Sequence, residues 1–153
     1  MPIRIDHITI TARDKEATMK WIARILGVEA GPVVEPFAIV KLDGCTLDYI
    51  DSEHDDIHMQ HVALRVDDEE FDAIYRRVVD AGIDFYGHPQ NPDDPAKGQI
   101  YFQESGGRGF YFMDPDGHWM EIKTARDDPR HAGGYDTGPF RPATTDRKRT
   151  NGR

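Results

Sequence analysis

The chain has 153 residues, of which 28 are acidic and 19 are basic, so its formal net charge at pH 7 is −9. This acidic balance argues against a surface for nucleic acid or for an anionic membrane. The length and the hydrophobic content of 38% suit one folded domain, or two fused half-domains, with a substantial core.

The cysteine and hydropathy patterns predict a cytoplasmic protein. Cys45 is the only cysteine of the sequence, so no internal disulfide can form. The sequence holds no apolar run near the ~18 residues of a membrane span and no apolar signal-peptide segment at its start. We therefore expect neither a membrane nor a nucleic acid among its partners.

The first half of the chain predicts a strand, a helix and a hairpin in that order. Pro2 to Thr11 alternates with a period of two, which is typical of a strand. The period then changes to that of a helix, which Gly27 ends as its C-terminal cap. Gly31-Pro32 breaks the chain, and Phe37 to Leu42 with Cys45 to Asp51 indicates a hairpin.

The second half predicts the same order again. Met59 to Val66 reads as a strand, and Asp67 with Glu70 forms a capping-box pattern at the start of a helix. That helix should end at Gly82, and its apolar stripe comprises Phe71, Ile74, Val78 and Val79. Two further extended segments are predicted at Ile83 to Tyr86 and Gln99 to Gln103.

The stretch from Arg108 to Thr124 predicts two strands around a tight turn, Asp114-Pro115-Asp116-Gly117. On the return strand, the period of two places Trp119, Glu121 and Lys123 on one face. Burying an unpaired carboxylate costs several kcal/mol. Glu121 should therefore be exposed, paired or bound to a metal.

An internal repeat joins these elements. Residues 37–48 align without gaps on residues 110–121, and His7 aligns on His61. This predicts an α+β fold of tandem βαβββ modules, 1–52 and 58–125, followed by a polar C-terminal tail, 126–153. The interval from His61 to Glu121 is 60 residues against 41 from His7 to Asp48, so the second half carries 19 more. We expect part of this excess, Gly87 to Gly98, to border the mouth of the site.

The repeat places four suitable ligands at matched strand positions: His7, Asp48, His61 and Glu121. Two imidazoles with one or two carboxylates suit a divalent metal ion: Zn²⁺, Fe²⁺, Ni²⁺, Co²⁺ or Mn²⁺. Aromatic residues on the same faces would suit an aromatic or apolar small-molecule substrate. They are Trp119, Tyr101 or Tyr111, and Phe37.

Three motifs carry a family resemblance: Asp6-His7-Ile8, Gln60-His61-Val62, and Tyr111-Phe-Met-Asp-Pro-Asp-Gly-His-Trp-Met-Glu121. With the double module, they resemble the vicinal oxygen chelate superfamily, which includes glyoxalase I, extradiol dioxygenases, fosfomycin-resistance enzymes and bleomycin-binding proteins. The resemblance covers about Pro2 to Thr124. It implies a curved mixed sheet, a homodimer, and a metal trio of His7, His61 and Glu121. Asp48 stands where glyoxalase I has a fourth carboxylate, but it is one methylene shorter.

The resemblance implies a metal-dependent enzyme whose substrate offers two neighbouring oxygens. Our leading expectation is a glyoxalase-like lyase or isomerase, with Glu121 or Asp48 moving a proton and Glu104 in reserve. An extradiol-type dioxygenase is the alternative. Tyr111 fits its pattern, but the upstream histidine of that pattern is missing, and Glu104 or His118 would have to replace it.

Two further activities stay open. Thiol transfer of the fosfomycin type needs an anion pocket, for which Arg65 and Arg108 are the candidates. A non-catalytic protein that binds an antibiotic or metabolite is the last alternative, although binders of this kind typically lack the metal ligands.

Overall fold

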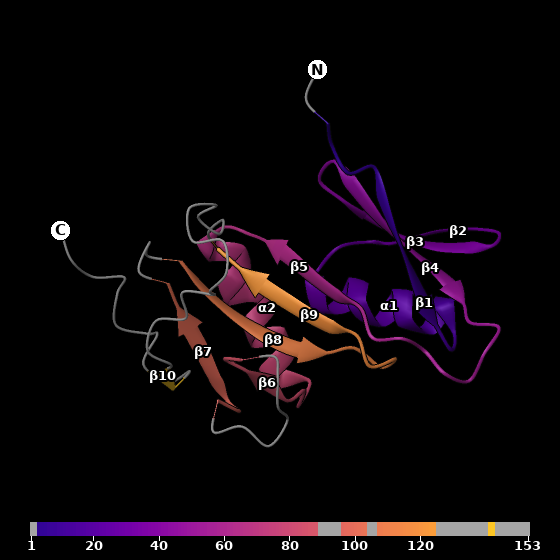
Figure 1. Cartoon of the computed structure of the whole chain (residues 1–153). Helices are drawn as coiled ribbons and strands as arrows, with labels where there is room; N and C mark the ends of the chain where they lie inside the picture. Colours follow the sequence, from indigo (N-terminus) through magenta and orange to yellow (C-terminus); the bar gives the residue numbers. More distant parts are fainter. Residues whose placement is uncertain (1–2, 89–95, 104–106, 125–140, 143–153) are drawn as a thin grey trace. The chain divides into compact units, whose positions relative to one another are not determined.

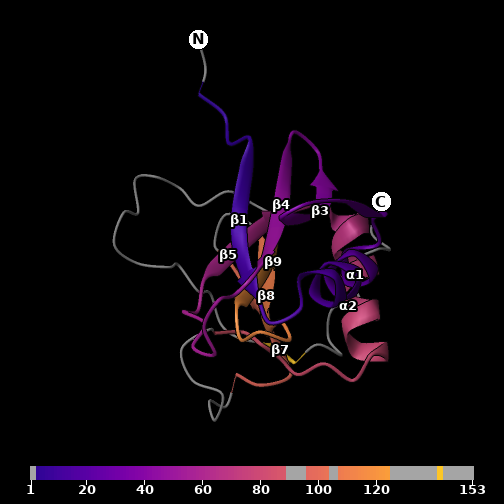
Figure 2. The same cartoon turned by 90° about the vertical axis from the view of Figure 1, so that its right-hand side faces the viewer.

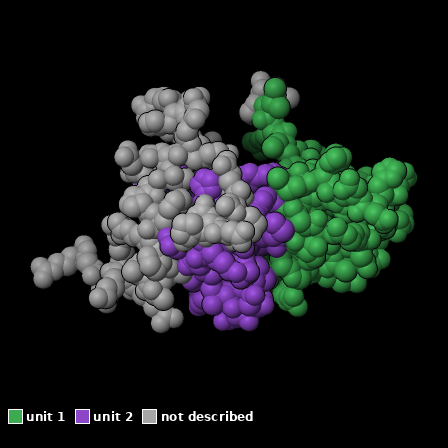
Figure 3. Space-filling view, turned by 60° about the horizontal axis from the view of Figure 1, so that its bottom comes forward, with its two compact units in different colours: residues 1–60, 114–118 green, residues 61–113, 119–153 purple. Residues whose placement is uncertain are grey.

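The computed structural model of the chain describes residues 3–88, 96–103, 107–124 and 141–142. The chain divides into two compact units (Figures 1 and 3). Unit 1 comprises residues 1–60 with the short segment 114–118, and unit 2 comprises residues 61–113 and 119–153. Each unit contains a sheet and one long helix, so the predicted α+β class is confirmed.

Unit 1 is a four-stranded sheet with one helix packed against it (Figure 2). The strand order is β1-β4-β3-β2, in which β1 and β4 are parallel and the other neighbours are antiparallel. The elements are β1 (His7–Ala12), α1 (Lys15–Leu26), β2 (Ala30–Val34), β3 (Phe37–Leu42) and β4 (Cys45–Asp51).

Helix α1 begins and ends where its capping residues require. The Asp14 carboxylate accepts a hydrogen bond from the Ala17 amide at 2.9 Å, and Gly27 takes the left-handed conformation at φ 74°. The apolar residues of α1 are buried where the helix contacts the sheet, and this burial of apolar surface stabilises the unit. They include Met19, Ile22, Ala23 and Leu26, and the buried residues of the sheet include Ile10, Val40, Leu47 and Tyr49.

Unit 2 is a six-stranded sheet with helix α2. The strand path is β10-β7-β8-β9-β5, with β6 also paired to β8, and only β5 and β9 are parallel along it. The elements are β5 (His61–Arg65), α2 (Asp68–Asp80), β6 (Phe85–Tyr86), β7 (Gln99–Phe102), β8 (Arg108–Met113), β9 (Trp119–Lys123) and β10 (Arg141–Pro142). The last strand places two residues of the predicted tail at the edge of this sheet.

Aromatic rings join α2 to its sheet. Phe71 meets Phe110 edge-on with ring centroids 5.3 Å apart, and Tyr75 meets Phe85 in the same way at 5.3 Å. The cap at Asp67 is confirmed, since its carboxylate accepts from the Glu70 amide at 2.8 Å. The prediction that Val79 belongs to the apolar stripe is wrong, because this residue is 45% exposed. A turn of about 100° per residue carries it away from the buried Val78.

The strand register supports the internal repeat. In unit 1, Thr9 pairs with Asp48 across the parallel strands β1 and β4. In unit 2, Ala63 pairs with Glu121 across the parallel strands β5 and β9. His7 lies two residues before Thr9, and His61 lies two residues before Ala63. Both histidines therefore stand at the same place in their sheets, on the face that carries the carboxylate.

The turn between β8 and β9 forms part of unit 1 and is bound there by buried polar groups. The carboxylate of Asp116 accepts hydrogen bonds from the Thr18 hydroxyl at 2.5 Å and from the Arg13 amide at 2.9 Å. Gly117 has φ 90° and its amide donates to the Asp114 carbonyl at 3.2 Å, which confirms the predicted turn. The sequence motif thus serves packing as well as chain reversal.

Asp114 has one satisfied and one unsatisfied oxygen. Its Oδ1 accepts from the Asp116 and His118 amides at 2.9 and 2.8 Å, whereas its buried Oδ2 has no hydrogen-bond partner among the described residues. Within the same described part of the chain, the buried Tyr49 hydroxyl also lacks a hydrogen-bond partner. Burial raises the pKa of the Asp114 carboxyl above its ordinary value, so the folded protein disfavours the charged form even with those hydrogen bonds.

We expect Asp114→Asn to stabilise the fold at pH 7. A carboxyl whose pKa is raised by folding loses its stabilising contribution as the pH rises through that pKa, and the amide does not titrate. The gain should therefore shrink as the pH falls through the raised pKa of Asp114, and it should vanish below about 4, where the wild-type carboxyl is protonated in both states. Urea unfolding of both proteins at several pH values measures this difference. A variant less stable than wild type at pH 7 would contradict the argument.

One expected break in the chain is instead a strand. Gly31-Pro32 was predicted to interrupt regular structure; both residues lie within β2, at the point where its pairing with β3 shifts register. Because β2 is an edge strand, a proline there removes no hydrogen bond that the sheet needs.

Among the described residues, no helix is long and apolar enough to cross a membrane.

Candidate functional site

The predicted ligands of unit 2 meet on one face of its sheet. Strand β9 carries Glu121 and its parallel neighbour β5 carries His61. Glu121 Oε2 lies 3.1 Å from His61 Nε2. The carboxylate side chain is only 2% exposed, and the imidazole is 33% exposed. A buried carboxylate and a partly open imidazole thus face one another at the edge of the buried region.

The second oxygen of Glu121 has its own partners. The Tyr101 hydroxyl donates to Oε1 at 2.5 Å, and Lys123 Nζ lies 3.8 Å from the same oxygen. Both side chains are buried. The mid-strand carboxylate is therefore compensated on both oxygens, as the cost of burying an isolated charge requires.

Aromatic side chains surround this pair. A buried cluster comprises Tyr86, Tyr101, Tyr111 and Trp119. The His61 ring lies 5.8 Å from that of Tyr111, and Tyr86 meets Trp119 edge-on at 5.6 Å. The predicted pocket residues Tyr101 and Trp119 thus lie beside the candidate ligands, together with Tyr111. Flat apolar walls with a few fixed polar groups are typical of small-molecule sites.

The ligands predicted in the first module lie in unit 1. The His7 side chain is 53% exposed, and its Nδ1 is 2.9 Å from Asp6 Oδ2. That hydrogen bond raises the pKa of the His7 imidazole, and the Asp48 carboxylate adds to the effect. Asp48 is half-buried and accepts a hydrogen bond from the Thr46 hydroxyl at 2.7 Å. Phe37 lies on the same sheet, also half-buried.

Arg108 has a structural role within unit 2. Arg108, a candidate for an anion pocket, forms ion pairs with Asp68 and Asp72 at 2.9 and 3.0 Å. Its guanidinium also lies 4.2 Å over the Phe71 ring, so it fastens β8 to α2. Its role as an anion ligand is not supported.

The His118 ring is fully buried in unit 1 and both of its nitrogens are engaged. Nε2 is 2.7 Å from the Thr11 carbonyl, and Nδ1 accepts from the Gln60 amide at 3.0 Å. This arrangement requires a neutral ring with the proton on Nε2. The idea that His118 replaces the missing acid/base histidine is therefore not supported.

The remaining predicted features are Arg65, Glu104 and the segment from Gly87 to Gly98. Arg65 is exposed on β5 and pairs in register with Lys123. Glu104 lies outside the described residues, as does most of the segment from Gly87 to Gly98. The ends of that segment are joined, because the Gly87 amide donates to the Ala96 carbonyl at 2.9 Å.

A model of the Glyoxalase/Bleomycin resistance protein/Dioxygenase superfamily matches residues 4–122. The chain belongs to this superfamily. The resemblance predicted from the three motifs is therefore confirmed, and the match spans both helices and every strand from β1 to β8.

Solved structures of this superfamily resemble the chain over most of its length. Oxidase ChaP-H2 is 38% identical, covers 82% of this chain and 96% of its own, and superposes with a TM-score of 0.74. Oxidase ChaP-H1 is 33% identical, covers 82% of this chain and 98% of its own, and has a TM-score of 0.73.

A relative in sequence matches a shorter part of the chain. Metallothiol transferase FosB of Shouchella clausii (strain KSM-K16) is 34% identical over 64 residues, which is 42% of this chain and 37% of that protein.

The chemistry of the His61–Glu121 pair fits a metal ion of the kind this superfamily binds. Two ligands at about 2.1 Å from one ion and at right angles to each other lie about 3.0 Å apart. The observed separation of 3.1 Å is close to that value. Within either unit, the described residues contain no cluster of three metal-ligating side chains. A metal ion bound by this pair would need at least one further ligand.

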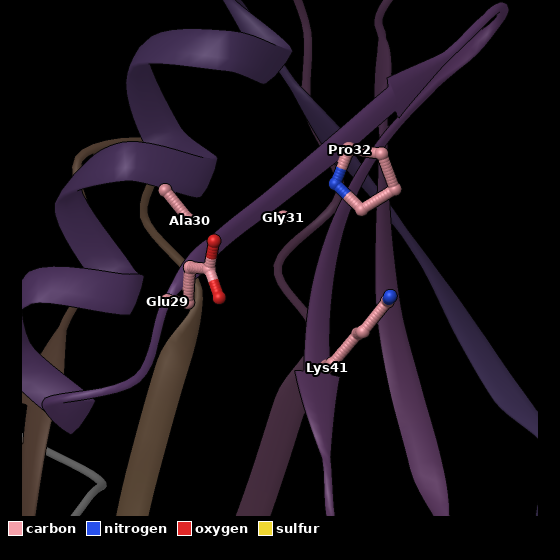
Figure 4. A pocket seen from close by; sticks show the side chains of 5 residues that line it. All are labelled: Glu29, Ala30, Gly31, Pro32 and Lys41. Atoms are coloured by element: carbon pink, nitrogen blue, oxygen red, sulfur yellow. The ribbon is translucent and has the colours of Figure 1, made fainter.

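A separate pocket of unit 1 does not share these features. It has a volume of about 410 Å³ and lies between β2 and β3 (Figure 4). Its lining residues are Glu29, Ala30, Gly31, Pro32 and Lys41. Glu29 and Lys41, its charged residues, are both exposed, and none of the predicted site residues reaches it.

Sequence reasoning missed three contributors to the site of unit 2. Tyr86 joins the aromatic cluster, Lys123 approaches Glu121, and Gly109 lies under the Tyr101 ring. For Lys123 the signal was present, because it follows Glu121 at the two-residue spacing of one strand face. The other two depend on the pairing of β6 and β7 with β8, which the sequence does not specify.

Proposed function

We propose that the chain is a metal-dependent enzyme that uses dioxygen to oxidise an aromatic substrate bearing two neighbouring oxygens. The observation that carries this proposal is the His61–Glu121 pair at 3.1 Å, beside a buried cluster of tyrosine and tryptophan rings. The pair supplies part of a ligand set, and the rings supply walls for a flat substrate.

His7 completes the metal centre in this proposal, giving two imidazoles and one carboxylate. It stands at the position in unit 1 that His61 occupies in unit 2. A set of this composition, with open positions for substrate and dioxygen, is typical of non-haem iron oxygenases. The bound ion would supply Lewis-acid binding of the two substrate oxygens and, as Fe²⁺, the redox chemistry with dioxygen.

The partners of Glu121 favour oxidation over isomerisation. A glyoxalase-like reaction needs a carboxylate at the metal that takes up and returns a proton. Here Oε1 already accepts the Tyr101 hydroxyl and lies near the Lys123 ammonium, and Oε2 faces His61. A carboxylate held in this way suits a fixed ligand. The two structures named oxidases, 38% and 33% identical, support the same choice.

The remaining residues of this face would bind and orient the substrate. Tyr111 pairs in register with Glu121, and Trp119 precedes Glu121 on the same face of β9. Both rings can therefore stack against a substrate whose oxygens reach the ion. Arg65, exposed on the same face of β5, would attract an anionic substituent.

The lyase or isomerase activity remains the second candidate, with Asp48 as its base. Asp48 occupies in unit 1 the register position of Glu121, and it is only half-buried. In that case the substrate would be the adduct of a thiol with a 2-oxoaldehyde, and the reaction would consume no dioxygen.

Oxygen uptake distinguishes the candidates. We expect protein loaded anaerobically with Fe²⁺ to consume dioxygen on mixing with members of a catechol panel, and a chelator to abolish the uptake. Ring cleavage would appear as a yellow product. Protein that consumes no dioxygen with any catechol but converts a thiol–oxoaldehyde adduct when loaded with Zn²⁺ or Ni²⁺ would establish the second candidate. Tight ligand binding without turnover under either condition would indicate a binding protein.

We also propose that the protein is a homodimer, and that His7 reaches the metal from the same chain or from a second copy. Mixing two inactive variants, His7→Ala and Glu121→Gln, separates these arrangements. If the site is shared between copies, mixed dimers contain one intact set of ligands and activity returns. If each chain supplies its own set, the mixture stays inactive.

A further inference from the structure

We propose that Tyr101 is a positioning residue for the Glu121 carboxylate, and that Gly109 is present because the Tyr101 ring needs its space. In this arrangement Glu121 presents a single oxygen to the metal and serves as a fixed ligand. The inference rests on the proposed function, in which Glu121 binds the metal ion.

The two carboxylate oxygens have different partners. Oε1 accepts the Tyr101 hydroxyl at 2.5 Å, and Oε2 lies 3.1 Å from His61 Nε2. Glu121 and Tyr101 are each 2% exposed, so water does not compete for this bond. Chelation through both oxygens would require both to turn toward one ion. The Tyr101 bond opposes that rotation and leaves Oε2 alone on the side of His61.

Lys123 strengthens the same asymmetry. Its ammonium nitrogen lies 3.8 Å from Oε1, and the side chain is buried. A hydroxyl donor and a positive charge thus both lie against Oε1, whereas Oε2 faces His61. This fixed arrangement is the physical basis for the role of Glu121 as a ligand.

Gly109 provides the space for the Tyr101 ring. The two residues face one another across β7 and β8. A Cβ atom at position 109 would lie 2.2 Å from both the Tyr101 Cζ and its hydroxyl oxygen, and 2.5 Å from Cε1. Such approaches are sterically forbidden, so any other residue would displace the ring from the strand and its hydroxyl from Glu121. The glycine is required here by packing rather than by backbone conformation.

The test uses Co²⁺ as the probe, because the absorption of bound Co²⁺ reports the number and type of its ligands. We expect Tyr101→Phe to weaken Co²⁺ binding on the order of 10- to 100-fold, as removing a group that orients a metal ligand typically does. We also expect the Co²⁺ absorption spectrum to change, because the released carboxylate can rotate. A loss of packing alone would lower thermal stability and leave that spectrum as it is.

Tyr75→Phe is the matched control. Tyr75 is a tyrosine of the same unit, and its ring packs on Phe85 and Phe110 between α2 and the sheet, outside the candidate site. This control should leave the affinity for Co²⁺ and the spectrum at their wild-type values.

Gly109→Ala provides a second route to the same result. It should reduce Co²⁺ affinity in the wild-type background and have little effect in a Tyr101→Ala background, where no ring remains to be displaced. If this substitution prevents folding, Tyr101→Phe still decides the question.

The outcomes separate the inference from the function on which it rests. Wild-type protein that binds no Co²⁺ would overturn the proposed function and this inference with it. Wild-type protein that binds Co²⁺, with affinity and spectrum unchanged in Tyr101→Phe, would overturn this inference alone.

Discussion

Glu121→Gln is expected to lower kcat by a factor on the order of 10³ or more. Glutamine keeps the shape of the side chain but removes the negative charge that holds the metal, and the metal contributes several kcal/mol to the reaction. The Tyr101 hydroxyl and the Lys123 ammonium would also lose their anionic partner, since both approach Glu121 Oε1. Steady-state kinetics with metal analysis of the same samples measures the effect.

A charge-matched control for this prediction is Glu53→Gln. Glu53 is an exposed residue of the connector between β4 and β5, outside the candidate site. The control should keep the activity and metal content of the wild type. Full activity in Glu121→Gln would rule out this carboxylate both as a ligand and as a base.

Asp116→Ala is expected to destabilise the protein by about 3 kcal/mol or more. The buried carboxylate accepts from the Thr18 hydroxyl, from the Arg13 amide and, at 3.3 Å, from the Arg13 guanidinium. The buried Thr18 hydroxyl left without an acceptor costs roughly 1–3 kcal/mol, and the bonds from the exposed Arg13 are also lost, which matters because hydrogen bonds to charged groups are the stronger ones. The midpoint of urea unfolding, followed by circular dichroism, measures the loss.

Asp55→Ala serves as the comparison for this stability prediction, because Asp55 is exposed in the connector. Substitutions of that kind usually change stability by less than about 0.5 kcal/mol. If Asp116→Ala shifted the midpoint no more than Asp55→Ala, the polar cluster around the turn would not stabilise unit 1.

Local signals explain the elements that were predicted well. Helix α1 was found because Asp14 and Gly27 cap it and its apolar residues recur with the helical period. The hairpin of β3 and β4 has the predicted bounds, Phe37–Leu42 and Cys45–Asp51. These features depend on neighbours within a few residues, and the sequence shows them directly.

Features that depend on the pairing of distant strands were not predicted. Strand β2 contains Gly31 and Pro32, which are tolerated because the strand lies at a sheet edge and its pairing shifts register at these residues. The sequence alone did not show which tyrosine donates a hydrogen bond to Glu121. That tyrosine is Tyr101, which the pairing of β7 with β8 places over Gly109. His118 looked like a catalytic residue because the sequence does not reveal that both of its nitrogens are engaged.

Anomalous X-ray diffraction from crystals of the Co²⁺-loaded protein tests the proposed metal centre most directly. We expect one strong peak, from an ion bound to His61 Nε2 and Glu121 Oε2 at about 2.0–2.2 Å. A His7 imidazole, from the same chain or a second copy, should be the third protein ligand. Stoichiometric Co²⁺ bound elsewhere, with His61 and Glu121 still paired only to each other, would contradict it.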